Sequence, residues 1–210
     1  LGWACWKTYL GRPEWDGYSC YAMQILANAL RTVRRPEEAL PVIEASLAVL
    51  RRFSPPDLEA ILTTRINLSG CLLEIGRQDE ALALSRDVYA EWVALKGVSH
   101  QVTITCGISL ANSLFMTKRW DEARTLVRDQ LLPVARQSLG ADHHETLKLN
   151  QVLAEAVHYD PTATRDDLLE AESILQDVVR RSRRVLGPAH PGTLRAEALL
   201  PRLRARLAHA

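Results

Sequence analysis

The sequence of 210 residues has 26 Lys and Arg against 25 Asp and Glu, which gives a formal net charge of +1. This balance argues against a strongly basic nucleic-acid-binding protein and against a protein with an acidic tail. Hydrophobic residues make up 47% and charged residues 24% of the chain, which excludes a wholly disordered protein, and no apolar run is long enough to predict a transmembrane segment.

The N-terminal end lacks the basic flank and apolar run of a signal peptide. It does not begin with Met, so we interpret the chain as a piece of a longer protein. The four cysteines, Cys5, Cys20, Cys71 and Cys106, include no C-x-x-C pair. In a chain with an ample core we expect such cysteines to be buried thiols in a reducing, cytoplasmic compartment.

Three short patterns recur along the chain in one register. An acidic-Ala pair occurs four times, with its alanines 42, 42 and 48 residues apart, at Ala39, Ala81, Ala123 and Ala171. A Leu followed by a small residue precedes each pair, at Leu26, Leu68, Leu110 and Leu153. A Gly-x-x-His-x-x-Thr pattern begins at Gly97, Gly140 and Gly187. Since all three keep the same phase, the sequence predicts a repeated structural unit.

Each unit is predicted to be a pair of helices. From Asp57 onward, apolar residues recur at helical spacing up to Gly76, and again from about Asp79 to Leu95. Acidic residues in the first turn of the second helix favour the positive end of the helix dipole. Gly76 can take the positive φ of a helix C-cap, so we place the turn of the pair there.

Several departures from this pattern lead to their own expectations. Lys118 and Arg34 replace the turn glycine, so we expect those two turns to be built another way. Residues 160–164 add a turn-rich insertion between the helices of the last pair. Pro133 is expected to kink a second helix, and Pro201 is expected to break the last helix.

Stacked helix pairs bury the apolar stripe that one pair cannot bury alone. The sequence therefore predicts an all-α solenoid with a unit of about 42–47 residues, a concave side and a convex side. In chain order we expect the end of a preceding repeat with its linker, four repeats and a C-terminal capping helix. Their ranges are 1–17, 18–57, 58–100, 101–144, 145–191 (with the insertion at 160–164) and 192–210.

The repeated residues resemble tetratricopeptide repeats of the kinesin-light-chain type. The resemblance covers almost the whole chain and rests on the Glu-Ala pairs and on the linkers Leu139-Gly140-Ala141-Asp142-His143 and Leu186-Gly187-Pro188-Ala189-His190-Pro191. It implies a superhelix that binds peptide segments of partner proteins in its concave groove, without implying a kinesin subunit. A HEAT or armadillo array has a similar unit length and is the alternative solenoid, although the phased linkers favour the tetratricopeptide repeat.

The resemblance also implies which side chains of each first helix line the groove. Carried over position by position, they are Tyr21, Gln24, Asn28, Arg31, Thr63, Ile66, Leu73, Thr105, Ile108, Asn112, Phe115, Met116, Lys148, Gln151, Glu155, His158 and Tyr159. The middle of this set is apolar, as suits the anchoring of a peptide. The alternative for each residue is packing against the neighbouring helix. The lysines of a clamp for chaperone C-terminal tails are missing, so we do not expect that ligand.

Motifs for catalysis and metal binding are weak. The chain has no Gly-rich phosphate loop. His143-His144-Glu145 lacks the i, i+4 spacing of a helical zinc pair, and the linker pattern already accounts for His143, whose ring can hydrogen-bond the backbone. Cys106 and His100 lie on different predicted elements with no third group in register. We therefore expect no enzymatic activity, no cofactor and no metal.

The C-terminal stretch from 180 to 210 is basic, with eight arginines against one acid and a local net charge of +7. One explanation is that arginines complement a helix dipole and cover apolar surface with their stems. The other is a docking patch for an acidic partner, a membrane surface or RNA, although no aromatic residue is interleaved as RNA binding would favour. The patch would comprise Arg180, Arg181, Arg183, Arg184, Arg202, Arg204 and Arg206.

Together these patterns predict a non-enzymatic, cytoplasmic scaffold that binds other proteins, with nucleic acid not expected as a partner. The first hypothesis is a transient adaptor whose groove recruits a peptide motif. The alternative is a permanent structural subunit whose groove or ends are filled by a fixed partner. Trp3, Trp6 and Trp15 slightly favour extra packing near the N-terminus, against a missing repeat or a partner.

Overall fold

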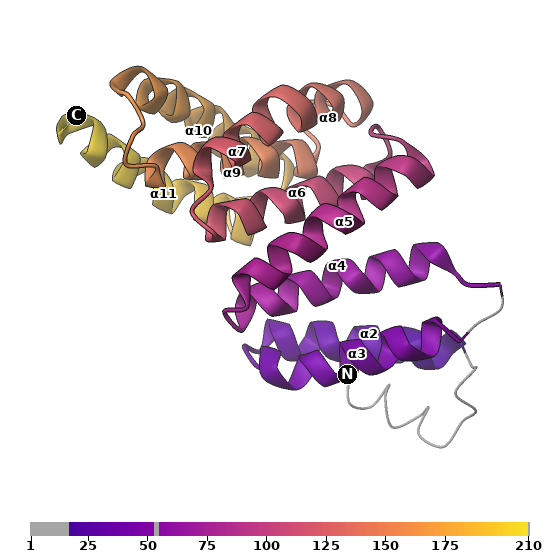
Figure 1. Cartoon of the computed structure of the whole chain (residues 1–210). Coiled ribbons are helices and arrows are strands. Elements are labelled where there is room, and N and C mark those ends of the chain that lie inside the picture. Colours follow the sequence, from indigo (N-terminus) through magenta and orange to yellow (C-terminus); the bar gives the residue numbers. More distant parts are fainter. Residues whose placement is uncertain (1–16, 53–54, 210) are drawn as a thin grey trace. The chain divides into compact units, whose positions relative to one another are not determined.

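The structure is a computed structural model that describes residues 17–52 and 55–209 (Figure 1). All regular secondary structure in these residues is helical, and consecutive helices form antiparallel pairs, so the predicted all-α fold of helix pairs is confirmed. The elements are α2 (Gly17–Thr32), α3 (Pro36–Leu50), α4 (Leu58–Glu74), α5 (Gln78–Lys96), α6 (Gln101–Met116), α7 (Trp120–Thr125), the π-helical η1 (Leu126–Leu131), α8 (Leu132–Ser138), α9 (His144–Tyr159), α10 (Arg165–Val185) and α11 (Pro191–His209). The predictions for Cys5, for the N-terminal tryptophans and for a preceding repeat fall on residues 1–16, outside the described residues.

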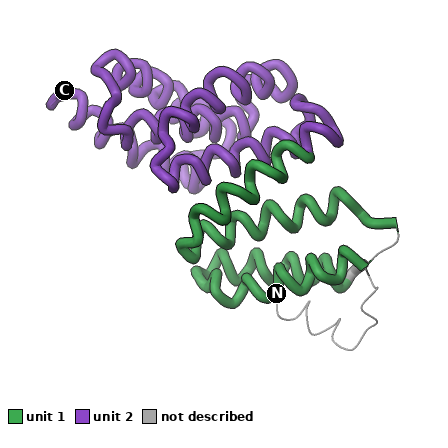
Figure 2. Tube along the Cα trace, viewed as in Figure 1, with its two compact units in different colours: residues 1–91 green, residues 92–210 purple. Residues whose placement is uncertain are grey.

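The chain forms two compact units, Leu1–Glu91 and Trp92–Ala210, and helix α5 carries the boundary between them (Figure 2). In unit 1, α2 and α3 form a hairpin and α4 packs on α3. The small residues of the repeated patterns are buried where helices meet: Ala39 is fully buried, and Ser69 donates its hydroxyl to the carbonyl O of Ala81 at 3.1 Å. Larger side chains at these positions would hold the helices apart.

In unit 2, α9 is the central helix. It packs against α6, α10 and α11, and most of its residues are buried. Leu168 and Leu175 of α10 and Leu203 of α11 are fully buried against it and complete the core. None of the described helices combines the length and the apolar character needed to cross a membrane.

The glycine and the histidine of the Gly-x-x-His-x-x-Thr pattern have the same role at all three places. Gly140 has a φ of +92°, a left-handed turn that glycine adopts without strain and that ends the preceding helix. His143 is the N-cap of α9, and its Nδ1 accepts a hydrogen bond from the backbone N–H two residues on, at 3.3 Å. The hydroxyl of Thr146 lies 3.5 Å from a backbone carbonyl of α8, to which it donates. The predicted bond from the ring to the backbone is confirmed here and also at His100 and His190.

The turns inside the first three helix pairs are alike. Gly76 has a φ of +85°, and Arg34 and Lys118 take φ values of +62° and +61° at the corresponding positions. The expectation that the arginine and lysine turns are built another way is therefore wrong. In each turn the next residue donates its N–H to the carbonyl O five positions back, at 2.9, 2.9 and 2.8 Å. These bonds hold a left-handed conformation that costs a residue with a side chain about 1 kcal/mol.

An arginine follows each of these turns and pairs with the glutamate of the Glu-Ala pattern. Arg77 donates to both carboxylate oxygens of Glu80, at 2.7 and 2.5 Å, and these hydrogen bonds lower the pKa of Glu80. The same pairing occurs in the neighbouring hairpins between Arg35 and Glu38 and between Arg119 and Glu122. The glutamate of the pattern thus has a local role at the start of a second helix.

The prolines and the insertion in unit 2 have different effects. Before Pro133 the helix widens into η1, and the N–H of Leu132 bonds to the carbonyl five residues back, so the predicted disturbance is a π-helical segment. Helix α11 runs through Pro201 without interruption, so the prediction that Pro201 breaks it is wrong. Pro201 is exposed, and its buried neighbours on α11 hold the helix against the core. In the insertion, Thr164 caps α10 by exchanging hydrogen bonds with Asp167.

Candidate functional site

Polar side chains of α2 and α4 face one another in unit 1. Gln24 Nε2 donates to Thr64 Oγ1 at 3.0 Å, and Arg31 donates two hydrogen bonds to the carboxylate of Glu74, at 3.0 and 2.8 Å. Arg31 lies over Gly70, where an added Cβ would be 2.5 Å from Arg31 Nη2. Two predicted groove residues are therefore bonded to the adjacent first helix. The other predicted residues of unit 1 are the exposed Tyr21 and Asn28 and the half-buried Thr63, Ile66 and Leu73.

Unit 2 repeats this arrangement between its first helices α6, α9 and α11. Thr105 Oγ1 donates to Glu145 Oε1 at 3.0 Å. Arg195 Nε and Nη2 donate to the two carboxylate oxygens of Glu155, at 2.7 and 2.6 Å. Both pairs join residues 40 positions apart, as does the pair of Gln24 with its threonine. Side chains that face the same way on successive first helices are thus cross-linked.

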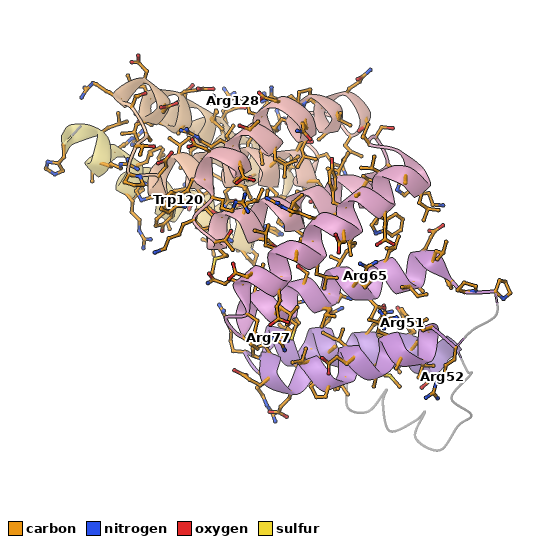
Figure 3. All side chains as sticks on the ribbon, in the orientation of Figure 1. Arg51, Arg52, Arg65, Arg77, Trp120 and Arg128 are labelled. Carbon is orange, nitrogen blue, oxygen red and sulfur yellow. The ribbon has the colours of Figure 1, made fainter. Side chains whose placement is uncertain are left out.

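Two pockets open on the side of unit 2 formed by α6, α9 and α11. The first, here called the aromatic pocket, has a volume of about 460 Å³, and Trp120 on its wall comes from the start of α7 (Figure 3). It is lined by Phe115, Met116, Lys118, Trp120, Glu155, Tyr159, Arg195, Ala198, Leu199 and Arg202. The second, here called the linker pocket, has a volume of about 340 Å³. It is lined by Asn112, His144, Leu147, Lys148, Gln151, Val152, Glu155, Ser182, Leu186, His190, Pro191, Gly192 and Arg195.

Contacts between aromatic rings fix the arrangement of the apolar side chains in the aromatic pocket. The rings of Phe115 and Tyr159 meet edge to face with centroids 5.4 Å apart, and Tyr159 makes a similar contact of 4.8 Å with His158. Tyr159 is 47% exposed, so part of its ring faces solvent. A row of three rings with one exposed member offers flat apolar surface to a ligand.

Charges on this side of unit 2 are unevenly placed. The carboxylates of Glu145 and Glu155 are buried and accept hydrogen bonds within the unit. Lys118, Lys148 and Arg202 are exposed, and none of them has a carboxylate partner in the part of the chain that the structure describes. The open side of the pockets therefore presents positive charge.

The surroundings of His158 favour its neutral form. Burial lowers the pKa of its imidazole, and the charges of Arg206 and Arg202 lower it further, against the opposite effect of Glu155. Its Nδ1 is buried without a hydrogen-bond partner among the described residues. The ring therefore belongs to the apolar row and adds no charge to the pocket.

Seven of the predicted groove residues line the pockets: Asn112, Phe115, Met116, Lys148, Gln151, Glu155 and Tyr159. Ile108 is only 1% exposed and belongs to the core. Sequence reasoning missed Lys118 of the α6–α7 turn, Trp120 at the start of α7 and the α11 residues Arg195, Ala198 and Leu199. The repeat register could have found part of α11, because Lys148, Gln151 and Glu155 correspond to residues 195, 198 and 202, each 47 positions on.

Six of the seven arginines of the predicted basic patch bind a carboxylate or a backbone carbonyl among the described residues. Arg181 and Arg184 both bind the carboxylate of Asp142, at 2.8 and 2.5 Å. Arg206 donates to backbone carbonyls at the end of α9. The remaining pairs are Arg180 with Asp177, Arg183 with Glu197 and Arg204 with Glu172. Asp142, Glu172 and Asp177 lie outside the stretch 180–210, so a charge count along that stretch overlooks them, and Arg202 lines the aromatic pocket.

The described residues contain no group of three or more His, Cys, Asp and Glu side chains arranged to hold a metal ion. Cys71 and Cys106 are buried free thiols, and Cys20 is buried as well. Burial raises the pKa of Cys106 to about 12, so its thiol is protonated at neutral pH and is a poor nucleophile.

Two family models, both described as tetratricopeptide repeat, match the chain. One matches residues 19–90 and the other matches residues 103–145 and 163–192, which together are more than half of the sequence. No curated protein matches the chain.

Solved structures share the fold at low sequence identity. One such structure is of a Podosopora anserina protein named as a kinesin light chain, whose repeats are described as nearly identical and TPR-like. It aligns with a TM-score of 0.72 and 20% identity over 90% of this chain and 86% of that chain. BtubC (BKLC) from P. vanneervenii aligns with a TM-score of 0.63 and 14% identity over 100% and 89%. A Rap protein complexed with Competence and Sporulation Factor aligns with a TM-score of 0.61 and 18% identity over 99% of this chain and 58% of that chain. The predicted likeness to kinesin-light-chain-type repeats is confirmed for the fold.

Proposed function

The chain belongs to the tetratricopeptide-repeat family, and from this premise we propose that it is a non-enzymatic scaffold that binds a peptide segment of a partner protein at the two pockets of unit 2. Proteins built from these repeats generally mediate protein–protein interactions. The family match sets aside the HEAT and armadillo alternative. The Rap protein, which shares the fold, is described in complex with Competence and Sporulation Factor, and this supports a binding role.

The aromatic pocket is the observation that carries the proposal. Its volume of about 460 Å³ lies within the range of about 300–1,000 Å³ that ligand pockets have. The rings of Phe115 and Tyr159 can bury a large apolar side chain, and the exposed cations Lys118 and Arg202 stand beside them. This chemistry suits a segment in which a bulky apolar residue lies next to acidic residues.

A transient adaptor fits these charges better than a permanent subunit. Attraction between exposed cations and a partner's carboxylates is screened by salt, so such a complex releases its partner at high ionic strength. A fixed subunit that fills the pockets with apolar surface would resist the same salt. The buried thiols of Cys71 and Cys106 support a reducing, cytoplasmic location.

The test is to select peptides on the purified chain from a random display library and to measure their affinities by fluorescence anisotropy at low and high salt. We expect selected peptides to combine an aromatic or large aliphatic residue with glutamate or aspartate. Arg202→Gln should weaken their binding by about three- to tenfold, since it removes one unpaired cation from the pocket. The matched control is Arg128→Gln, because Arg128 is also exposed but pairs with Glu170 and lines neither pocket. Failure to select any peptide, or equal binding to both variants, would refute the proposal.

A further inference from the structure

Glu155 and Arg195 line both pockets of unit 2. They form a bidentate ion pair with N–O distances of 2.7 and 2.6 Å. Gln151 Nε2 donates a third hydrogen bond, to Glu155 Oε1, at 3.0 Å. The Glu155 side chain is only 6% exposed, whereas the Arg195 side chain is 63% exposed. The exposed guanidinium of Arg195 is thus hydrogen-bonded on its inner side to the buried carboxylate of Glu155.

The ion pair with Glu155 engages the guanidinium of Arg195, which is the group best suited to bind an acidic ligand. A guanidinium recognises a carboxylate through a planar pair of N–H donors, and the Nε and Nη2 donors of Arg195 are already used in this way. The pair has no net charge, so Arg195 adds little to the attraction that Lys118 and Arg202 exert. A partner's carboxylate that approaches Arg195 also approaches Glu155, which repels it.

Stability does not explain why the carboxylate is there. Exchanging a buried ion pair for apolar side chains of similar volume is often neutral or stabilising. Removing Glu155 would leave Arg195 exposed to solvent, where its charge is hydrated, so no buried charge would remain unpaired. We therefore expect the loss of Glu155 to change ligand binding more than it changes stability.

We propose that Glu155 is a specificity-determining residue that competes internally with the acidic group of the partner for Arg195. By neutralising Arg195 it weakens the binding of acidic segments and leaves their selection to Lys118 and Arg202. This inference rests on the proposed function, because it assumes that an acidic segment binds at these pockets.

The experiment measures the affinity of the acidic peptide selected by display, in fluorescein-labelled form, for the wild-type chain and for Glu155→Gln. The variant should bind about three to ten times more tightly at low salt, because removing one negative charge beside the ligand strengthens the local positive potential. The gain should shrink at high salt and should vanish for a version of the peptide whose acidic residues are replaced by glutamine and asparagine. Adding Arg195→Gln should return the affinity to near the wild-type value.

The matched control is Glu170→Gln, which removes the same charge from an ion pair outside both pockets and should leave the affinity unchanged. Circular dichroism establishes that each variant is folded, and Glu155→Met, which keeps the length of the side chain, serves as the second variant. Equal or weaker binding of the acidic peptide by both Glu155 variants, with normal binding by the wild type, would overturn this inference alone. Absence of binding by every form of the chain would overturn it together with the proposed function.

Discussion

Two glycines inside helices have different surroundings. A Cβ added at Gly107 of α6 would lie 2.5 Å from Cδ2 and 2.8 Å from Cδ1 of Leu131, which is 3% exposed. Leu131 is the last residue of the π-helical η1, and its side chain occupies the space that is left because Gly107 of α6 has no side chain. At Gly70 of α4 the nearest atoms belong to the end of the Arg31 side chain, which is long and partly exposed.

We predict that Gly107→Ala destabilises the protein by about 1–3 kcal/mol, because a buried leucine has to move in a packed core. Urea denaturation followed by circular dichroism measures the change. Gly70→Ala is the control: alanine favours the helix by about 1 kcal/mol, and the displaced ion pair of Arg31 costs a similar amount or less, so stability should change little. Equal destabilisation by the two substitutions would contradict the assigned packing of Leu131.

His158 gives the protein a pH dependence whose sign follows from its lowered pKa. In the unfolded chain this histidine takes up a proton near pH 6.5, whereas in the folded chain it does so only at a lower pH. Between these values the unfolded state binds more protons, so stability falls as the pH falls. We predict that His158→Gln loses less stability than the wild type when the pH drops from about 7.5 to about 5.5.

Urea midpoints at the two pH values measure this difference. Substitution of the exposed His209 by glutamine is the control for a general effect of losing a histidine. The same pH dependence in the wild type and in His158→Gln would show that the fold does not lower the pKa of His158.

At the scale of elements, Arg124 joins α7 to the insertion and to α10. Its Nη2 lies 3.5 Å from Oδ2 of Asp160, and its Nη1 lies 3.7 Å from Oδ1 of Asp167. The Asp160 side chain is only 4% exposed, and its other oxygen accepts hydrogen bonds from Thr162. The arginine also donates a hydrogen bond from Nη2 to the exposed Asp121, and it balances the charge of the buried Asp160 carboxylate at ion-pair distance without a hydrogen bond.

We predict that Arg124→Ala destabilises the protein by about 3 kcal/mol, because Asp160 would remain buried with an uncompensated charge. Asp160→Asn in the same chain should recover part of the loss. Arg128→Ala is the control, because the pair of Arg128 (labelled in Figure 3) with Glu170 is exposed and contributes about 0–1 kcal/mol. Thermal unfolding of the three variants measures these effects, and a loss below about 1 kcal/mol for Arg124→Ala would argue against a buried ion pair there.

At the scale of the whole molecule, the repeat was predictable because each of its landmarks has a local cause. A glycine with positive φ and a histidine N-cap act within a few positions of themselves, and a small residue at a helix crossing acts within one helix pair, so sequence spacing reveals them. The turns at Arg34 and Lys118 were not predictable from residue type, because backbone hydrogen bonds across each turn impose the left-handed conformation. Helix α11 likewise continues through Pro201 because its contacts with the core, which sequence does not display, hold it.

The candidate site was predictable only in part. The register placed Phe115, Lys148 and Tyr159 on the helix faces that line the pockets of unit 2. It could not reveal that the polar residues Gln24, Arg31 and Glu155 bind side chains about one repeat away, because such pairing depends on how adjacent helices are set against each other.

Helical periodicity, helix caps and small residues at helix crossings depend on residues that are close in the sequence, and for that reason the sequence alone predicts a fold of helix pairs. Which side chains stay accessible to a partner follows from how the folded helices pack. Carboxylates elsewhere in the described residues bind five of the seven arginines of the predicted patch, whereas Arg202 lines the aromatic pocket. The physical reason is that the availability of a charged group depends on its neighbours in space, whereas the helices depend mainly on neighbours along the chain.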